Sequence, residues 1–86
     1  MNKSPYKSPW YVYIVECRDT SLYVGIALDL AKRISEHNSS ETCKYTRTRK
    51  PVILRYQERL ADHSAALRRE AAIKKLNREK KLALFR

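Results

Sequence analysis

The stretch of sequence that decides the fold is WYVYIVECRDTSLYVGI, residues 10–26. Residues 10–17 and residues 22–26 are rich in β-branched and aromatic side chains, which are typical of strands. The polar tetrad RDTS, residues 18–21, favours a turn between them. The stretch therefore predicts a β-hairpin, around which the remaining elements have to pack.

Side-chain alternation along the two strands decides which tyrosines of the hairpin can meet. In the first strand it places Tyr11, Tyr13 and Val15 on one face. In the second strand it places Tyr23 and Gly25 on one face. Two strand faces that carry tyrosines can therefore come together.

Residues 29–37 have the pattern of an amphipathic helix. Asp29 is a suitable N-cap, because its side chain can accept a hydrogen bond from the first helical turn. Arg33 and His37 are about 40° apart on this helix, so we expect both side chains to point toward the surface on which it packs. The apolar stripe that they border consists of Leu30, Ala31 and Ile34.

A second helix is predicted over residues 65–76, with Asp62 in the capping region before it. Glu70 lies at the edge of its apolar arc. Asn77 interrupts the pattern before a last, short basic helix. The arc itself consists of Ala65, Ala66, Ala72, Ile73 and Leu76.

The remaining segments complete one domain. Residues 1–9 contain two prolines and are expected to form a flexible arm. Residues 39–51 form a polar, basic loop, and residues 52–60 have the pattern of a third strand. A chain of 86 residues is long enough for a single hydrophobic core, so we expect residues 10–86 to be one domain.

The net charge of the chain is +10. A charge of this size on a small surface favours a polyanionic partner, DNA or RNA, over the alternative of an ordinary solvated basic surface. No apolar run approaches the ~20 residues that a bilayer span needs, and the N-terminus lacks the apolar core of a signal peptide. We therefore expect a cytoplasmic protein without a membrane partner.

Two classes of cofactor site are disfavoured. Gly25 is the single glycine, whereas nucleotide-binding loops need several. The cysteines, Cys17 and Cys43, are too far apart in sequence for a typical zinc site, and we expect free thiols.

Five positions of the chain, taken in order, resemble the motifs of a GIY-YIG nuclease domain. They are carried by YVY at residues 11–13, YVG at residues 23–25, Arg33 with His37, and Glu70. The resemblance covers residues 10–83. The layout of the chain is similar to the short stand-alone branch of that family, whose members are similar in turn to the nuclease domain of the bacterial excision-repair incision subunit. Tyr11 stands where the first motif begins with glycine, and the loop NSSETC lacks the glycine that the short branch usually carries.

What the resemblance implies is an α+β fold, a small three-stranded antiparallel or mixed sheet flanked by helices. It also implies a single-metal site that cleaves phosphodiester bonds in DNA with Mg²⁺ or Mn²⁺. Glu70 matches the metal-binding carboxylate. The matching site residues are Tyr13, Tyr23, Arg33, His37 and Glu70.

These residue types suit phosphodiester hydrolysis, which requires an oriented water, a cation against the phosphoryl charge and a proton acceptor. Glu70 can hold a hard cation that keeps most of its waters, and the planar guanidinium of Arg33 suits a phosphate. Tyr13 and His37 are alternative proton acceptors, and Tyr23 is a positioning hydroxyl. Each residue also has an ordinary structural role as the alternative, either in strand packing or at the edge of a helix.

Two basic segments are candidates for phosphate contacts. We expect the loop and Lys74 to contact nucleic acid, with a solvated surface and a Glu70–Lys74 ion pair as the alternative. The loop residues are Lys44, Tyr45, Arg47, Arg49 and Lys50. The C-terminal segment also carries Lys75, Arg78, Lys80 and Lys81.

These features lead to one main hypothesis. We expect a metal-dependent DNA endonuclease that is structure-selective or weakly sequence-specific and acts in DNA repair or recombination. The alternatives are a non-catalytic DNA- or RNA-binding module of the same fold and a basic protein-interaction domain. Only the nuclease hypothesis predicts that Glu70→Ala abolishes metal-dependent cleavage while DNA binding remains. We expect a monomer or weak homodimer. Whether a partner protein supplies targeting stays open.

Overall fold

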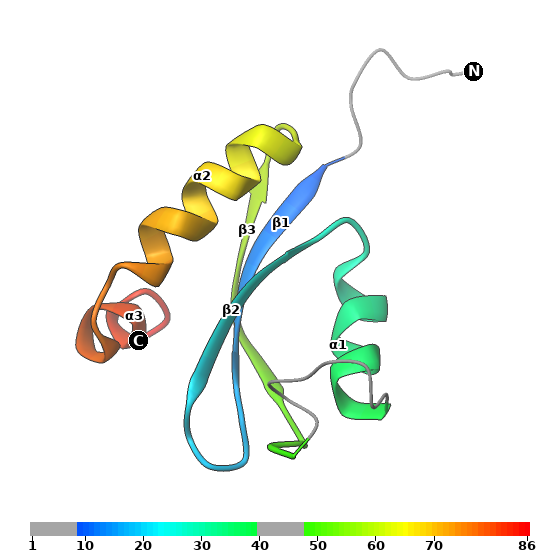
Figure 1. Cartoon of the computed structure of the whole chain (residues 1–86), viewed down its shortest axis with the longest axis vertical. Coiled ribbons are helices and arrows are strands. Elements are labelled where there is room, and N and C mark those ends of the chain that lie inside the picture. The colour runs from blue at the N-terminus through cyan, green and yellow to red at the C-terminus, as the bar shows by residue number, and fades with distance from the viewer. Residues whose placement is uncertain (1–8, 40–47) are drawn as a thin grey trace.

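The computed structural model describes residues 9–39 and 48–86. The expected flexible arm, except residue 9, and the middle of the basic loop lie outside the described residues. None of the described helices has the length and apolar character that crossing a membrane requires. The elements, in chain order (Figure 1), are β1 (Trp10–Glu16), β2 (Leu22–Ala27), α1 (Leu30–Ser39), β3 (Ile53–Leu60), α2 (His63–Lys74) and α3 (Arg78–Ala83).

The three strands form one sheet in the order β2-β1-β3. The hairpin expected over residues 10–26 is confirmed, and Tyr13 of β1 lies opposite Gly25 of β2. Both strand pairings are antiparallel, so the mixed sheet does not occur. β1 is the central strand, and β2 and β3 are the edges.

Helices cover both faces of this sheet (Figure 1). α2 packs on one face through Ala66 and Ile73, which are both fully buried. α1 packs on the other face through Leu30 and Ile34, beside the buried Tyr13. Burial of a side chain such as Ile73 stabilises the fold by about 1.5–3 kcal/mol. The α+β architecture therefore has a core layer on each side of the sheet.

Each helix begins at a side-chain cap that the sequence indicates. Asp29, Asp62 and Asn77 each accept a hydrogen bond from the backbone N–H of the third residue of the helix, at 3.0, 2.8 and 2.9 Å respectively. A cap of this kind stabilises a helix by about 1 kcal/mol. The caps fix where the three helices begin.

The buried face of α2 differs from the expected arc. The helix begins and ends two residues earlier than the expected range 65–76, because it begins directly after Asp62. Ala66 and Ile73 are its buried residues, whereas Ala72 is exposed. In α1, Ala31 is likewise exposed rather than part of the buried stripe.

A β-bulge in β3 switches the faces of its side chains. The residues of β1 that lie opposite Leu54 and Tyr56 are consecutive, so Arg55 is an extra residue. As a result, Leu54 packs with the core on the α1 side, and Tyr56 packs with the core on the α2 side. Arg55 Nε forms an ion pair with Glu16 Oε1 at 2.9 Å.

Side chains tie both flanks of the basic loop to the rest of the fold. Asn38, near the end of α1, pairs with the backbone of Val52: Oδ1 accepts from the Val52 N–H at 2.6 Å, and Nδ2 donates to the Val52 carbonyl at 3.2 Å. Arg49 Nε forms an ion pair with Asp19 Oδ2 at 3.1 Å. The two ends of the loop are therefore held close to the sheet.

The turn between β1 and β2 contains a residue in the left-handed region. Thr20 has φ 69°, a conformation that favours glycine. Its carbonyl accepts a hydrogen bond from Arg78 Nη1 at 2.7 Å, which joins α3 to the turn. Hydrogen bonds from Ser21 lower the pKa of the neighbouring Asp19.

Candidate active site

The Tyr13 side chain lies across the edge strand β2. Tyr13 is paired with Gly25, and a methyl group at Gly25 would lie 2.5 Å from the Tyr13 hydroxyl and 2.7 Å from its Cζ. Only the absence of a side chain on Gly25 therefore allows the ring to take this path. The hydroxyl reaches past the central strand toward the outer edge of the sheet.

The Tyr13 hydroxyl forms a hydrogen bond with a histidine of α1. Its oxygen lies 2.8 Å from His37 Nε2, and the Tyr13 and His37 residues are 1% and 0% exposed. The half-buried ring of Tyr23 lies beside both, with centroid distances of 6.4 Å to Tyr13 and 5.2 Å to His37. Among the described residues, His37 is the one polar side chain in the buried class.

Burial decides the charge of His37. Desolvation, and secondarily the positive charge of Arg33, lower the pKa of His37 below its ordinary value of 6.5, while Glu36 acts in the opposite direction. The imidazole is therefore neutral at pH 7. In the tautomer that carries its proton on Nδ1, Nε2 accepts the hydrogen bond that the Tyr13 hydroxyl donates.

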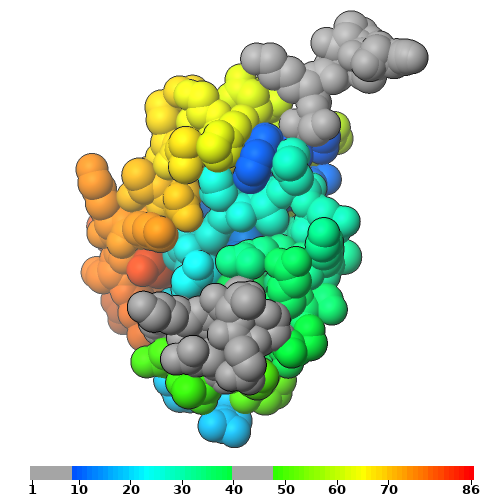
Figure 2. All heavy atoms as spheres, turned by 45° about the vertical axis from the view of Figure 1, so that its right-hand side comes forward, coloured from blue at the N-terminus to red at the C-terminus, as the bar shows by residue number. Residues whose placement is uncertain are grey.

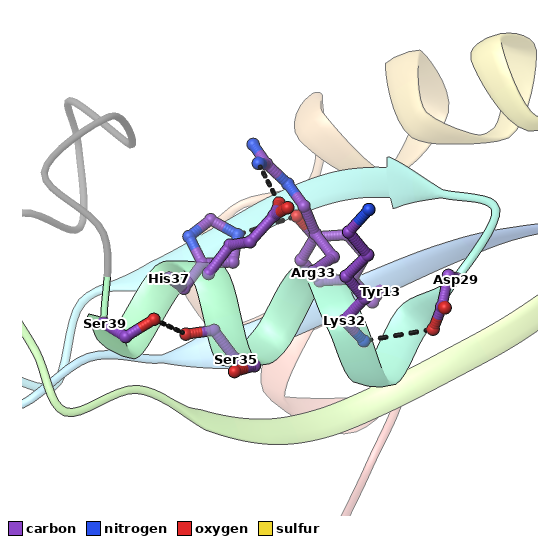
Figure 3. A network of polar contacts seen from close by, with 8 residues as sticks. Tyr13, Asp29, Lys32, Arg33, Ser35, His37 and Ser39 are labelled. Carbon is purple, nitrogen blue, oxygen red and sulfur yellow. Dashed lines mark hydrogen bonds and ion pairs between the residues drawn. The ribbon is translucent and has the colours of Figure 1, made fainter.

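Arg33 brings a cation to the same side of α1. Figure 3 shows Arg33 and His37 projecting from this helix toward β2 and the Tyr13 side chain. Arg33 Nη1 lies 3.2 Å from Glu36 Oε1, and the Arg33 side chain is 35% exposed. The guanidinium is held in place at the surface, where it can contact an anion.

The direction of Glu70 follows from its neighbour on α2. Arg69 and Glu70 lie on opposite sides of the buried Ala66–Ile73 stripe, each about 50° from it. Arg69 Nε donates to Glu58 Oε1 of β3 at 2.7 Å, so Arg69 faces the β3 edge. Since α2 packs against both β2 and β3, Glu70 faces the β2 edge.

The environment of Glu70 is partly open. Its side chain is 19% exposed, and Oε2 lies 3.4 Å from Lys74 Nζ, so the alternative expectation of an i,i+4 pair is confirmed. Glu70 comes from the face of the sheet opposite to α1. It therefore approaches the site from the other side of β2.

Figure 2 shows β2, in cyan, at the surface between α2, in yellow and orange, and α1, in green. The five expected residues thus form a site around the outer edge of this strand, called the β2-edge site below. Arg33 and Glu70 flank the strand, while Tyr13 and His37 lie beneath the surface. The members of the β2-edge site are Tyr13, Tyr23, Arg33, His37 and Glu70.

The segment that contains these residues matches a known family of protein domains. Residues 9–83 match the model of the GIY-YIG catalytic domain. The chain belongs to this family. The GIY-YIG domain is a nuclease domain, and the match spans both strand motifs and all three helices.

Similar proteins carry the same domain over most of their length. A UPF0213 protein of Staphylococcus saprophyticus is 53% identical over 75 residues, which are 87% of this chain and 92% of the relative. A UPF0213 protein of Halobacterium salinarum is 47% identical over 75 residues, 87% of this chain and 97% of the relative.

Solved structures of similar proteins have the same fold. The solution NMR structures of a UPF0213 protein from Bacillus halodurans and of a protein from E. faecalis superpose with TM-scores of 0.57 and 0.61. Each is 41% identical and covers 88% of this chain and 81% of the other. The GIY-YIG fold expected from the sequence is therefore confirmed.

Only some of the residues expected to contact nucleic acid are described in this GIY-YIG domain. Arg49 is used to bind Asp19, and Lys50 is half-buried before a cis peptide bond to Pro51. Lys74 is 56% exposed beside Glu70. Three loop residues lie outside the described part of the chain: Lys44, Tyr45 and Arg47.

Two supporting residues of the GIY-YIG site were not expected. Glu36 orients Arg33, and the i,i+3 spacing on one helix was a signal that could have indicated it. Asn38 holds the end of α1, and with it His37, against Val52. This contact spans 14 residues of sequence, so no local pattern indicates it.

The donor set of the GIY-YIG site fits one hard divalent cation. Glu70 offers a single, partly open carboxylate. Residues 9–39 and 48–86 contain no cluster of three or more His, Cys, Asp or Glu side chains that could surround a metal. Mg²⁺ usually keeps several waters and needs one or two protein carboxylates, so Glu70 is the residue that would hold it.

Proposed function

We propose that the protein is an endonuclease that hydrolyses phosphodiester bonds in DNA with a divalent cation, Mg²⁺ or Mn²⁺. The observation that carries the proposal is the buried hydrogen bond of 2.8 Å between Tyr13 and His37, beside Arg33 at the β2 edge. A neutral histidine whose pKa is lowered by burial is typical of a site that moves protons. Membership of the GIY-YIG family supports the reaction class.

The proposed chemistry assigns one role to each residue. Tyr13 takes the proton of the attacking water, and His37 Nε2 accepts the proton that Tyr13 gives up. Arg33 binds the non-bridging oxygens of the scissile phosphate, and Tyr23 positions it. Glu70 would hold a divalent ion, which would stabilise the developing negative charge.

The burial of Tyr13 adds a requirement to this proposal. With 1% of the residue exposed, a water reaches its hydroxyl only if the edge of β2 opens locally when DNA binds. Tyr23 is the half-buried ring beside both buried groups, and its movement is the smallest change that creates such a path. Binding and proton transfer are thus coupled in the proposal.

The proposed substrate is DNA with a branched, flapped or otherwise irregular structure, as in repair or recombination in the cytoplasm. The charge of +10 supports contacts with many phosphates, which carry no sequence information. Specific reading of the major groove normally requires a helix or strand pair that presents side chains to the base edges. α1 and α2 instead pack on the sheet and flank the site, which favours recognition of shape.

Cleavage of labelled substrates tests the proposal. The panel consists of single strand, duplex, flap, branched junction and RNA, each with Mg²⁺, Mn²⁺ or chelator. Glu70→Ala should reduce the cleavage rate at least about a hundredfold, because it removes the metal ligand, and should change DNA affinity less than twofold. Glu79→Ala, which removes an exposed carboxylate from α3, is the matched control and should cleave normally.

Two results would overturn the proposal. Cleavage that survives in Glu70→Ala would remove the assigned metal ligand. Salt-sensitive DNA binding without cleavage of any substrate would instead identify a non-catalytic binding module of the same fold.

A further inference from the structure

A cleft of about 440 Å³ lies beside α3 and the C-terminal end of the described chain. Its volume falls within the usual range for small-molecule sites. Its lining includes Glu16, Arg55, Arg78, Leu82, Phe85 and Arg86. We call this feature the α3 cleft.

Three guanidinium groups line the α3 cleft, and each keeps donors that the fold does not use. Arg55 donates through Nε to Glu16, so both of its terminal nitrogens can donate to a ligand. Arg78 uses Nη1 for the Thr20 carbonyl. Arg86 is exposed, and within residues 9–39 and 48–86 no hydrogen bond holds its side chain.

The charge of the cleft favours an anion. One side-chain carboxylate, that of Glu16, stands against three guanidinium groups, and its ion pair with Arg55 offsets its repulsion of an anion. The β-bulge at Arg55 is what places this guanidinium beside Glu16 and α3. Guanidinium donors match the oxygens of a phosphate, often in pairs.

The apolar part of the lining suits the rest of a nucleotide. Leu82 and Phe85 are half-buried, and Phe85 also packs against the core on the α2 side. An aromatic ring anchored in this way can support a base or sugar next to a phosphate. The cleft therefore combines an anion site with a flat apolar surface.

The α3 cleft is separate from the β2-edge site. None of its lining residues is a member of the β2-edge site. Arg55 lies on β3 and Tyr23 on β2, the two opposite edge strands of the sheet. Ligand binding in the cleft can therefore be measured without the proposed cleavage chemistry.

We propose that the α3 cleft is a second phosphate-binding site, which takes a nucleotide phosphate ester. The phosphate binds Arg78 and Arg86, with Arg55 completing the site, and the nucleoside lies against Phe85. The same chemistry occurs in a free mononucleotide and in a unit of a DNA strand that extends from the β2-edge site. These two sources differ in the number of phosphates that bind at once, so they can be separated by experiment.

NMR titration of the full chain at low salt, without divalent cation, tests this site apart from cleavage. The probes are thymidine monophosphate and a thymidine tetranucleotide. We expect saturable shifts of the Arg78 and Arg86 side-chain Nε–H signals and of the Phe85 amide. Tighter binding of the tetranucleotide identifies a strand as the source, and equal affinities identify a mononucleotide.

Variants separate the site from general electrostatics. Arg86→Gln should weaken binding of the tighter probe about tenfold, as expected for loss of a charged hydrogen bond. Arg59→Gln, which removes an exposed arginine elsewhere on β3, should change it less than twofold. Arg78→Gln should also weaken binding, and the same spectra report whether the fold survives loss of its contact with Thr20.

Three results would overturn the proposal. One is the absence of saturable shifts at the cleft with either probe. The second is an equal loss of affinity in Arg86→Gln and Arg59→Gln. The third is a set of shifts confined to residues of the β2-edge site.

Discussion

Replacement of Gly25 by alanine tests how the β2-edge site is built. The added methyl group would lie 2.5 Å from the Tyr13 hydroxyl and 2.7 Å from its Cζ, far inside the optimal carbon separation of about 3.5–4.0 Å. The ring cannot move away without loss of the 2.8 Å contact with His37. Overpacking costs about 1–3 kcal/mol, and a buried polar group left unpaired costs about 1–3 kcal/mol more.

We therefore expect Gly25→Ala to lower the free energy of unfolding by about 2–6 kcal/mol. In a chain of 86 residues, each 1 kcal/mol corresponds to a decrease in Tm of about 4–8 °C. Thermal and urea unfolding, followed by circular dichroism, measure this effect. Cleavage should fall as well, because the proposed proton acceptor is displaced.

The same substitution in a Tyr13→Leu variant tests whether the Tyr13 ring causes the destabilisation. In Tyr13→Leu the ring is absent, so Gly25→Ala should be neutral or stabilise the strand by up to about 1 kcal/mol, since glycine is unfavourable within a strand. The sign of the effect thus depends on Tyr13. Equal destabilisation in both backgrounds would refute the argument that Gly25 exists to admit the Tyr13 ring.

Three further predictions concern His37, Asn38 and Thr20. Because the folded-state pKa of His37 is below 6.5, the unfolded chain binds the proton first on acidification, so the free energy of unfolding should fall below about pH 6.5 and level off under the folded-state pKa. Urea titrations across this range should lose that part of the slope in His37→Gln, and an unchanged slope would assign it to another group. Asn38→Ala should destabilise the fold by about 1–3 kcal/mol in urea, because it leaves both backbone groups of Val52 without their partner, whereas Ser39→Ala on the same helix end should cost less than about 0.5 kcal/mol. Thr20→Gly should raise stability by about 0.5–1 kcal/mol in thermal unfolding, because Thr20 has φ 69°, and a loss of stability would contradict the strain argument.

The sequence was sufficient for the parts of the fold that depend on local patterns. Alternation along residues 10–26 placed Tyr13, Tyr23 and Gly25 on the correct face, because the pleat of a strand leaves two choices only. The N-caps of the helices were predictable for the same reason, although α2 begins two residues earlier than expected. Asp29 caps the turn that directly follows it, and no distant residue takes part.

The features that escaped prediction depend on contacts between distant segments. The bulge at Arg55 reverses the faces of β3 and has no composition signal. Ala72 appeared part of a buried arc because it is apolar, but the roll of α2 is fixed by Ala66, Ile73 and the Arg69–Glu58 ion pair. The burial of the Tyr13 hydroxyl likewise follows from three segments that meet, and no single one of them indicates it.

The paired contacts of Asn38 with Val52 have a consequence for how this domain can change. They join the end of α1 to the start of β3. The ion pair of Arg49 with Asp19 joins the residues before β3 to the hairpin turn. The described residues on both flanks of residues 40–47 are therefore anchored to the rest of the fold. A replacement segment of different length or charge could therefore be inserted between these anchors as a cassette, with the Asn38–Val52 contacts next to His37 left in place.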